Sequence, residues 1–375
     1  MRILIAVAVV IVCMQHGDRC LGAPLNPSDF NSLGALPTGD FQINTDSLTF
    51  DGIAGGLLHP QGGGAPDIAV FVFDGDSMLA SGDTISVIGN NALAILFRGS
   101  ATLSGTIDVS GSDGIDAIQN VVTGIGGLGV AGGGRGGNGG PFSSGQDGVG
   151  PGHGVVGSNS ASVSGVGSGS GAGFGTMGGQ GGAAVTFRPG GSPYGDPLSE
   201  LLFAGSGGGG GGGRGNERLG GGGGAGGGAV EIGALTSLEF EGASILANGG
   251  SGSLGFAGAG GGSGGGILLH AFDVSIDQDT LIQANGGHGS VPTNLGGCGG
   301  AGRIEILYNP DGSFDSLGAI EAQSGEGGGD CIDGQPVVTA TTGVGVPEPS
   351  SLLMTILLLS LCGRRVATRV ASCSV

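Results

Sequence analysis

The side chains with the most obvious chemical capacity in this chain are acidic, and several of them stand close together in sequence. These groups offer oxygen atoms to calcium: Asp74 with Asp76, Asp113 with Asp116, Asp277 with Asp279, and Asn309 with Asp311 and Asp315. Calcium requires about six to eight converging oxygen ligands, and the tandem glycine-aspartate repeat of calcium-binding β-rolls is absent. The run Asn-Pro-Asp-Gly at 309–312 also suits a turn. Calcium is the only cofactor that the sequence leaves open, and we predict no metal site.

Nucleophile and histidine motifs are also weak. Ser263 lies in Gly-x-Ser-x-Gly, the spacing of a nucleophile elbow, but within a polyglycine run that lacks the strand-to-helix setting of that motif. The histidines outside the N-terminal segment lack the spacing of metal ligands, and we interpret them as isolated surface residues: His59, His153, His270 and His288. The chain has no lysine, which excludes lysine-dependent phosphate binding and Schiff-base chemistry. We therefore predict no catalytic or cofactor-binding residues and no enzyme.

Composition limits both the partners and the core. The formal net charge is -19 and all basic residues are arginines, so nucleic acid is a poor partner. Gly 95 among 375 residues is far above average usage. Because glycine contributes no side chain to a core, the core must come from the apolar segments between the glycine runs.

Those apolar segments repeat. Units at 228–250, 266–287 and 302–325 follow one another at roughly three dozen residues, a spacing typical of repeat architectures. Each has three short apolar–polar alternations followed by glycine, and period-two alternation places Val230 and Ile232 on one face of a strand. Further strands are expected at these earlier positions: 68–73, 84–88, 92–97 and 101–109. We predict an all-β, right-handed parallel β-helix or similar β-solenoid, with a sandwich as the alternative.

The long glycine runs have two interpretations. Residues 124–182 and 206–228 are either disordered linkers or compact loops packed beside the solenoid. They lack glycine at strictly every third position, so a collagen helix is not expected.

A β-helix of this kind raises one enzymatic alternative, a polysaccharide lyase or hydrolase. Such a site needs converging carboxylates, and the candidates are Asp108, Glu231, Glu305 and Glu321. The alternative would require two of them within about 10 Å in an open groove, the carboxyl separation that glycosidases use.

The N-terminal segment has the order of a secretory signal peptide. Arg2 precedes an unbroken apolar run at 3–14, and small residues suited to cleavage occur at 20–23. The run is too short to span a bilayer comfortably. The sequence therefore predicts export.

The C-terminal segment combines three features. Val346, Pro347, Glu348 and Pro349 hold the backbone extended, residues 352–362 are apolar, and Arg364 with Arg365 follow. Arginines favour the cytoplasmic side of a membrane, so an apolar helix would hold the extended peptide just outside the bilayer. A plain anchor helix that is never cut is the simpler alternative.

This order resembles the PEP-CTERM sorting signal, and the resemblance covers 346–369. It implies that an exosortase-type peptidase of the inner membrane removes the tail from a protein destined for the cell envelope or the exopolysaccharide matrix. The apolar run is shorter than the ~20 residues of a full span, and the chain continues past the arginine pair to Val375.

Two cysteines remain once both ends are set aside. Cys298 and Cys331 lie in glycine-rich loops, and an oxidising compartment would permit one disulfide between them. Two free thiols are the alternative.

The sequence thus predicts a modular exported protein whose function is structural or adhesive, at the cell surface or in the extracellular matrix. A calcium-dependent adhesin or carbohydrate-binding module is the alternative. The expected segments are a signal peptide (1–22), N-terminal strands (23–112), glycine-rich loops (113–228), solenoid repeats (229–330), a linker (331–345), the sorting signal (346–369) and a tail (370–375).

Overall fold

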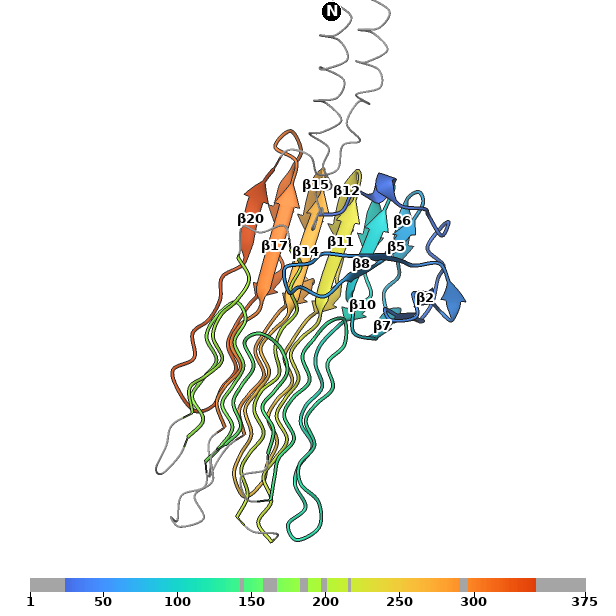
Figure 1. The fold of residues 1–375 in the computed structure, drawn as a ribbon. Helices are drawn as coiled ribbons and strands as arrows, with labels where there is room; N and C mark the ends of the chain where they lie inside the picture. Colours follow the sequence, from blue (N-terminus) through green and yellow to red (C-terminus); the bar gives the residue numbers. More distant parts are fainter. Residues whose placement is uncertain are drawn as a thin grey trace, which may run out of the picture.

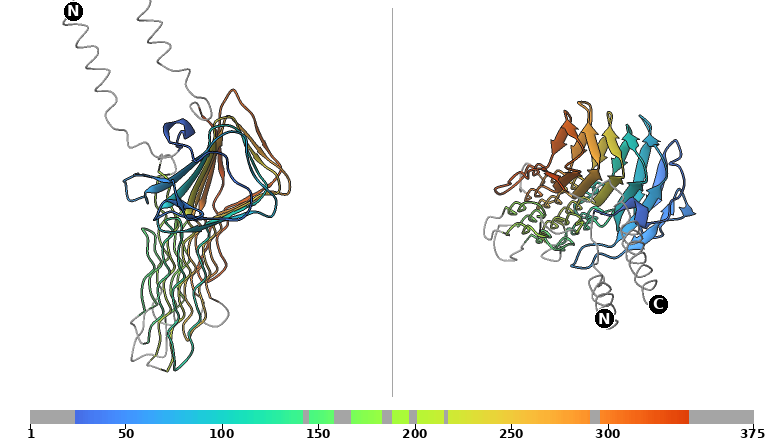
Figure 2. Two further views of the ribbon diagram at one scale, coloured as in Figure 1. Left: turned by 90° about the vertical axis from the view of Figure 1, so that its right-hand side faces the viewer. Right: turned by 90° about the horizontal axis from the view of Figure 1, so that it is seen from above.

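A computed structural model describes residues 24–141, 145–157, 167–182, 188–196, 201–214, 217–290 and 296–341. Within these ranges the chain is nearly all β, with a single-turn 3-10 helix at Pro27–Asp29 and no α-helix. The predicted all-β, β-helix-like architecture is confirmed: three sheets of mostly parallel strands form the three sides of a solenoid (Figures 1 and 2). The predicted C-terminal apolar helix lies outside the described residues.

Each complete turn of the solenoid contributes one strand to each sheet. The first sheet contains β4 (Leu57–His59), β5 (Ile68–Phe73), β8 (Ala92–Phe97), β11 (Ala229–Ala234), β14 (Gly266–Ala271), β17 (Arg303–Tyr308) and β20 (Val337–Ala340). The second contains β6 (Ser77–Leu79), β9 (Ala101–Leu103), β12 (Ser237–Phe240), β15 (Asp273–Ile276) and β18 (Phe314–Ser316). The third contains β1 (Phe41–Asn44), β2 (Thr49–Phe50), β3 (Ile53–Ala54), β7 (Thr84–Ile88), β10 (Thr106–Asp108), β13 (Ser244–Leu246), β16 (Leu281–Gln283) and β19 (Ala319–Glu321).

The interior of the solenoid is a stack of apolar side chains in matching register. Ile232 on β11 lies between Ile95 on β8 and Leu269 on β14, and Leu269 is followed by Ile306 on β17. All four are fully buried in one continuous core. Because full burial of one such side chain contributes about 1.5–3 kcal/mol, strands of three to six residues become stable only when successive turns stack.

A second apolar layer covers the outer side of the first sheet. Leu25 and Phe30, in the segment that we call the N-terminal strap (residues 25–30), pack with Leu202 on outward-facing residues such as Val70 and Leu268. Strands of the first sheet are therefore buried on both sides, which is why β5 is a continuous apolar run rather than an alternation.

The glycine-rich segments all leave from one corner of the solenoid, between a strand of the third sheet and the next strand of the first. Figures 1 and 2 show these excursions running side by side into an elongated lobe beside the solenoid. We call the described parts of 110–228, 247–265, 284–302 and 322–336 the glycine lobe. Of the two interpretations of the glycine runs, the described parts match compact loops packed beside the solenoid.

Backbone hydrogen bonds hold the lobe together with a period of three residues. The amides of Gly205, Gly208 and Gly211 donate to Gly227, Gly224 and Gly221, while Gly207 and Gly210 donate to a different neighbour, at Val149 and Gln146. Each extended segment of the lobe, called a chain of the lobe below, has three residues per turn. It bonds a different neighbouring segment on each side and has no hydrogen bond within itself, which is the arrangement of packed polyproline II-type helices.

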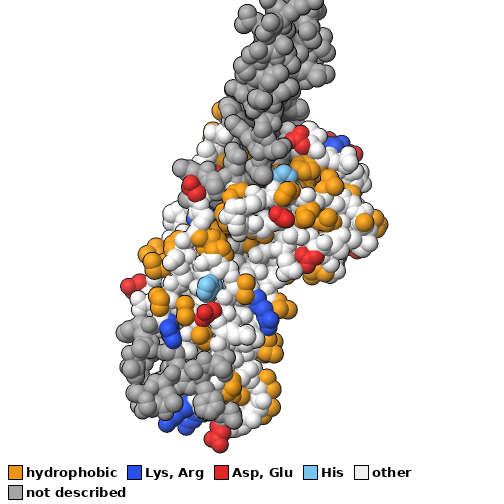
Figure 3. Space-filling model, in the orientation of Figure 1, with side chains coloured by type: hydrophobic (Ala, Val, Ile, Leu, Met, Phe, Trp, Pro, Cys, Tyr) orange, Lys and Arg blue, Asp and Glu red, His pale blue; other side chains and the backbone are white. Residues whose placement is uncertain are grey.

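Close packing of these backbones explains why the residues are glycine. A Cβ placed on Gly208 would lie 2.2 Å from the carbonyl oxygen of Gly260, and one on Gly223 would lie 2.2 Å from that of Gly208. No side chain fits between chains at that separation. The described part of the lobe is thus built largely of backbone, and most of the surface that Figure 3 colours there is uncharged.

Candidate functional site

One face of the glycine lobe continues directly from the third sheet. Val109 and Gly111 donate to Leu246 and Asn248 at the two-residue interval of a parallel sheet. The bonds then change to a three-residue interval, because Gly114 donates to Ser251 and Ala117 donates to Leu254. The strands therefore pass into threefold helices without losing their neighbours.

Polar side chains on this face occupy the backbone donors of the adjacent chain. Asn248 Oδ1 accepts from the amide of Asn285 at 2.8 Å, and Asn285 Oδ1 accepts from that of Gln323 at 2.7 Å. Asp113 and Asp116 accept from the amides of Ser251 and Leu254 at 2.6 and 2.7 Å. We give the name polar ladder to these side chains together with the polar residues whose amides they bind: Ser110, Asp113, Asp116, Asn248, Ser251, Asn285, His288, Gln323 and Glu326.

The ladder explains the recurring Ala-Asn-Gly-Gly sequence. The alanines Ala247 and Ala284 are buried in the solenoid core, the asparagines bind the next chain, and the following glycines enter the lobe. The repeat units at 228–250 and 266–287 could be recognised from sequence, but the ladder that their asparagines form could not. The usable signal was an amide side chain at the same place in successive units.

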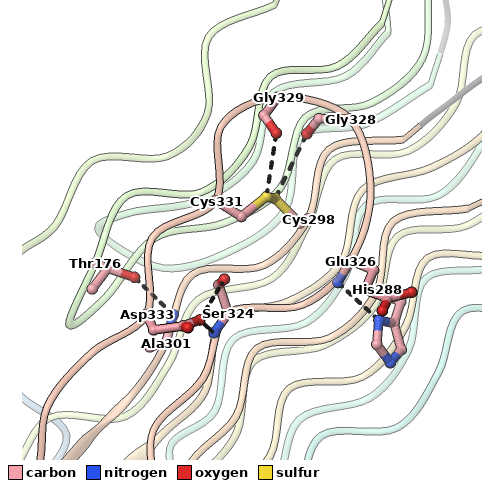
Figure 4. Close-up of a disulfide and its surroundings, with 10 residues drawn as sticks. All are labelled: Thr176, His288, Cys298, Ala301, Ser324, Glu326, Gly328, Gly329, Cys331 and Asp333. Atoms are coloured by element: carbon pink, nitrogen blue, oxygen red, sulfur yellow. Dashed lines mark hydrogen bonds between the residues drawn. A yellow bond between two sulfur atoms is a disulfide. The ribbon is translucent and has the colours of Figure 1, made fainter.

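A pocket of about 300 Å³ lies within the ladder, where three chains run side by side. Asp113 and Asp116 line it from the first chain, Leu254 from the second, and His288 with Ser290 from the third. His288 Nδ1 accepts the amide hydrogen of Glu326 at 2.8 Å (Figure 4). Because a neutral imidazole with Nδ1 as acceptor carries its hydrogen on Nε2, His288 adds a donor to a pocket that two carboxylates also line.

The hydrogen bonds within the pocket leave capacity for a ligand. Each aspartate uses Oδ1 for the adjacent chain, and among the described residues no hydrogen bond engages either Oδ2. Ser290 is 4% exposed, and its Oγ has no hydrogen-bond partner within the described part of the chain. That hydroxyl is itself buried, so Asp113, Asp116 and His288 are the side chains that present polar atoms in the pocket.

A disulfide joins Cys298 and Cys331 in the part of the lobe that also carries His288 and Glu326 (Figure 4). Their Cα atoms are 6.4 Å apart. Cys298 is fully buried, and its amide donates to the carbonyl of Gly328. The bridge fastens the chain that carries Glu326, and hence the hydrogen bond that orients His288, to the rest of the lobe.

The interpretation of His270 as a surface histidine is wrong. His270 is 2% exposed, and its Nε2 lies 2.8 Å from Oε1 of the fully buried Glu231. The ring lies over Gly233, where any Cβ would collide with it. The amide of Leu25 binds the same carboxylate oxygen, so the pair anchors the N-terminal strap to the first sheet.

The four carboxylates considered for an enzyme lie in different surroundings. Glu231 is enclosed beneath the N-terminal strap, whereas Asp108 and Glu321 lie on β10 and β19, which β13 and β16 separate. Burial raises the pKa of Glu305, and nearby Arg303 opposes that shift. Ser263 is buried inside the lobe, where its Oγ accepts the amide hydrogen of Ser206.

The acidic groups considered for calcium mainly bind backbone amides. Asp277 accepts from Gly242, and Asp74 pairs with Arg98 at 3.5 Å. Asn309 accepts from Asp311 and Gly312, which makes 309–312 a turn. No group of three or more His, Cys, Asp or Glu residues suited to a metal ion occurs in the described ranges.

The predicted sorting residues lie outside the part of the chain that the structure describes: Val346, Pro347, Glu348, Pro349, Arg364 and Arg365. Among the described residues, no helix is long and apolar enough to cross a membrane. Comparison with protein-family models, curated proteins and solved structures finds no match to this chain.

Proposed function

We propose that this chain is an exported structural or adhesive protein of the cell surface or extracellular matrix. The glycine lobe is the observation that carries the proposal. Its chains are fixed by backbone bonds in several directions, and the excursions are held at one corner of the solenoid. Such a body suits a stiff spacer with a flat contact surface better than a catalytic cavity.

Exposed chemistry on the lobe supports the same proposal. The polar ladder offers a regular array of amides, hydroxyls and carboxylates, which suits contact with hydrated polymers. A net charge of -19 favours solubility and disfavours nucleic acid. A right-handed winding of the solenoid is part of the proposal, because parallel crossover connections are overwhelmingly right-handed.

Processing at both ends is the second part of the proposal. The signal peptide would direct export, and an exosortase-type peptidase would recognise Pro347, Glu348 and Pro349 together with the apolar run and the arginine pair. The chain would then be anchored in the inner membrane only until its tail is removed.

A single fractionation experiment tests the proposal. An epitope tag is placed near Thr341, upstream of the sorting motif, and the intact mass of the tagged species is measured in each cell fraction. We expect a surface or medium species that ends near Pro349. A full-length C-terminus retained in the inner membrane would show a simple anchor and would overturn the sorting proposal.

A further inference from the structure

We propose that the pocket among Asp113, Asp116, Leu254, His288 and Ser290 is a binding subsite for a neutral, hydroxyl-rich polysaccharide. This inference rests on the proposed function as a matrix protein, and it names the chemical class of the contacted polymer. A sugar ring fits the mixed character of the pocket, which combines hydrogen-bond acceptors, donors and an apolar side chain.

Hydrogen-bond complementarity is the first argument. The two free Oδ2 atoms of Asp113 and Asp116 accept from sugar hydroxyls. His288 Nε2 donates to a hydroxyl or ring oxygen, because Nδ1 is occupied by Glu326. Sugar hydroxyls need both kinds of partner, and the pocket supplies both.

Side-chain fixation is the second argument. Each aspartate is held by a bond to the adjacent chain, and His288 is held by Glu326. The pocket therefore presents its polar atoms in place before a ligand arrives, which reduces the entropy lost on binding. Leu254, with 51% of its surface exposed, offers an apolar contact for the C–H groups of a ring.

Charge and spacing select the ligand class. Two carboxylates in a chain of net charge -19 repel an anionic polymer. Asp113 and Asp116 are three residues apart in a threefold helix, so their attachment points are about 9 Å apart. That separation suits contacts spread along one extended polymer better than contacts to a single small ligand.

The test uses full-length protein purified in detergent and measures its depletion by cellulose, chitosan and alginate beads. We expect retention on cellulose that is the same at low and high salt, with no retention on alginate. The double variant Asp113→Asn/His288→Asn should bind cellulose about tenfold more weakly, since two ligand hydrogen bonds are weakened or lost. Asparagine keeps both bonds to the adjacent chains, as Asn248 and Asn285 do elsewhere in the ladder.

Asp273→Asn is the matched control, because Asp273 binds the amide of Ser313 in the same way on the second sheet. It should bind cellulose like the wild type. Equal retention of the double variant and the wild type would overturn the proposal. Retention on chitosan alone, lost at high salt, would overturn the assignment to a neutral polymer.

The two proposals fail separately. A surface-exported protein that is retained on none of the three polymers would refute the saccharide subsite and leave the matrix function standing. A chain that stays full-length in the inner membrane, yet binds cellulose when purified, would refute the sorting proposal and retain the subsite.

Discussion

Substitution of a single glycine inside the lobe tests whether its backbones pack as closely as the structure describes. Gly208 donates to Gly224 and accepts from Gly137, both at 2.9 Å. In Gly208→Ala, the new methyl group would lie 2.2 Å from the oxygen of Gly260 and 2.6 Å from its carbonyl carbon. Both obstructing atoms belong to a backbone that is itself bonded on other sides, so no side chain can rotate away.

The cost follows from two contributions. Forcing a methyl group into a filled interior costs about 1–3 kcal/mol. Displacing the chain far enough to admit it weakens the two hydrogen bonds of Gly208, each worth about 0.5–1.5 kcal/mol. We therefore expect Gly208→Ala to lower the free energy of unfolding by about 2–6 kcal/mol, measured by urea denaturation.

Gly212 provides the matched control in the same run of glycines. A Cβ at Gly212 meets its nearest neighbour, the oxygen of Gly157, at 3.1 Å. Its backbone does not have positive φ, and alanine restricts the unfolded chain, which offsets part of any cost. Gly212→Ala should therefore change stability by less than about 1 kcal/mol. If the two variants unfold at the same urea concentration, the close packing of the lobe is wrong.

Three further predictions concern the bonds outside the glycine packing. Cys331→Ser should lower the free energy of unfolding by about 3–4 kcal/mol, because the disulfide no longer restricts a loop with a sequence separation of 33 in the unfolded chain. In thermal melts, a reductant should destabilise the wild type and leave the variant unchanged. Glu231→Ala removes the hydrogen-bond acceptor of His270 and Leu25 and should cost about 1–3 kcal/mol of folding stability for each buried donor left unpaired. The variant should expose the N-terminal strap to limited proteolysis, and unchanged cleavage would contradict the anchoring role. The hydrogen bonds from Gly242 and then Thr280 lower the pKa of Asp277. The contribution of the Asp277 carboxylate to folding stability is therefore present above the unfolded pKa of about 3.9 and is lost as the pH falls through the lower folded value. The stability difference between wild type and Asp277→Asn should shrink on acidification, and a pH-independent difference would contradict this assignment.

The solenoid could be predicted because its signal is local and repeated. Alternation at Val230 and Ile232 recurs in successive units, and pairing similar units in register places apolar side chains beside apolar side chains. The double burial of the first sheet could not be predicted, because Leu25 and Leu202 cover it from distant parts of the chain. For the same reason His270 resembled a surface residue, since its partner Glu231 lies on another turn.

The candidate site was much less accessible from sequence. Asp113 and Asp116 were identified as oxygen donors, but their bonding partners are 138 residues away. The ladder also depends on the change from a two-residue to a three-residue interval after Gly111. A run of glycines carries no periodic side-chain pattern, so neither that change nor the neighbour of each chain can be read from composition.

The three-residue interval of the glycine lobe also makes its length adjustable independently of the solenoid. Inserting three residues into each of the two legs of an excursion adds one helical turn of about 9 Å to both and restores the original orientation of every later amide. One or two residues would instead rotate the donors away from their acceptors. Matched insertions in neighbouring excursions would therefore move the tip outward in fixed steps, while the core residues Ile95, Ile232 and Leu269 keep their places. Such a protein can change its reach through duplications of three codons at a time in the gene, without redesign of the part that folds around side chains.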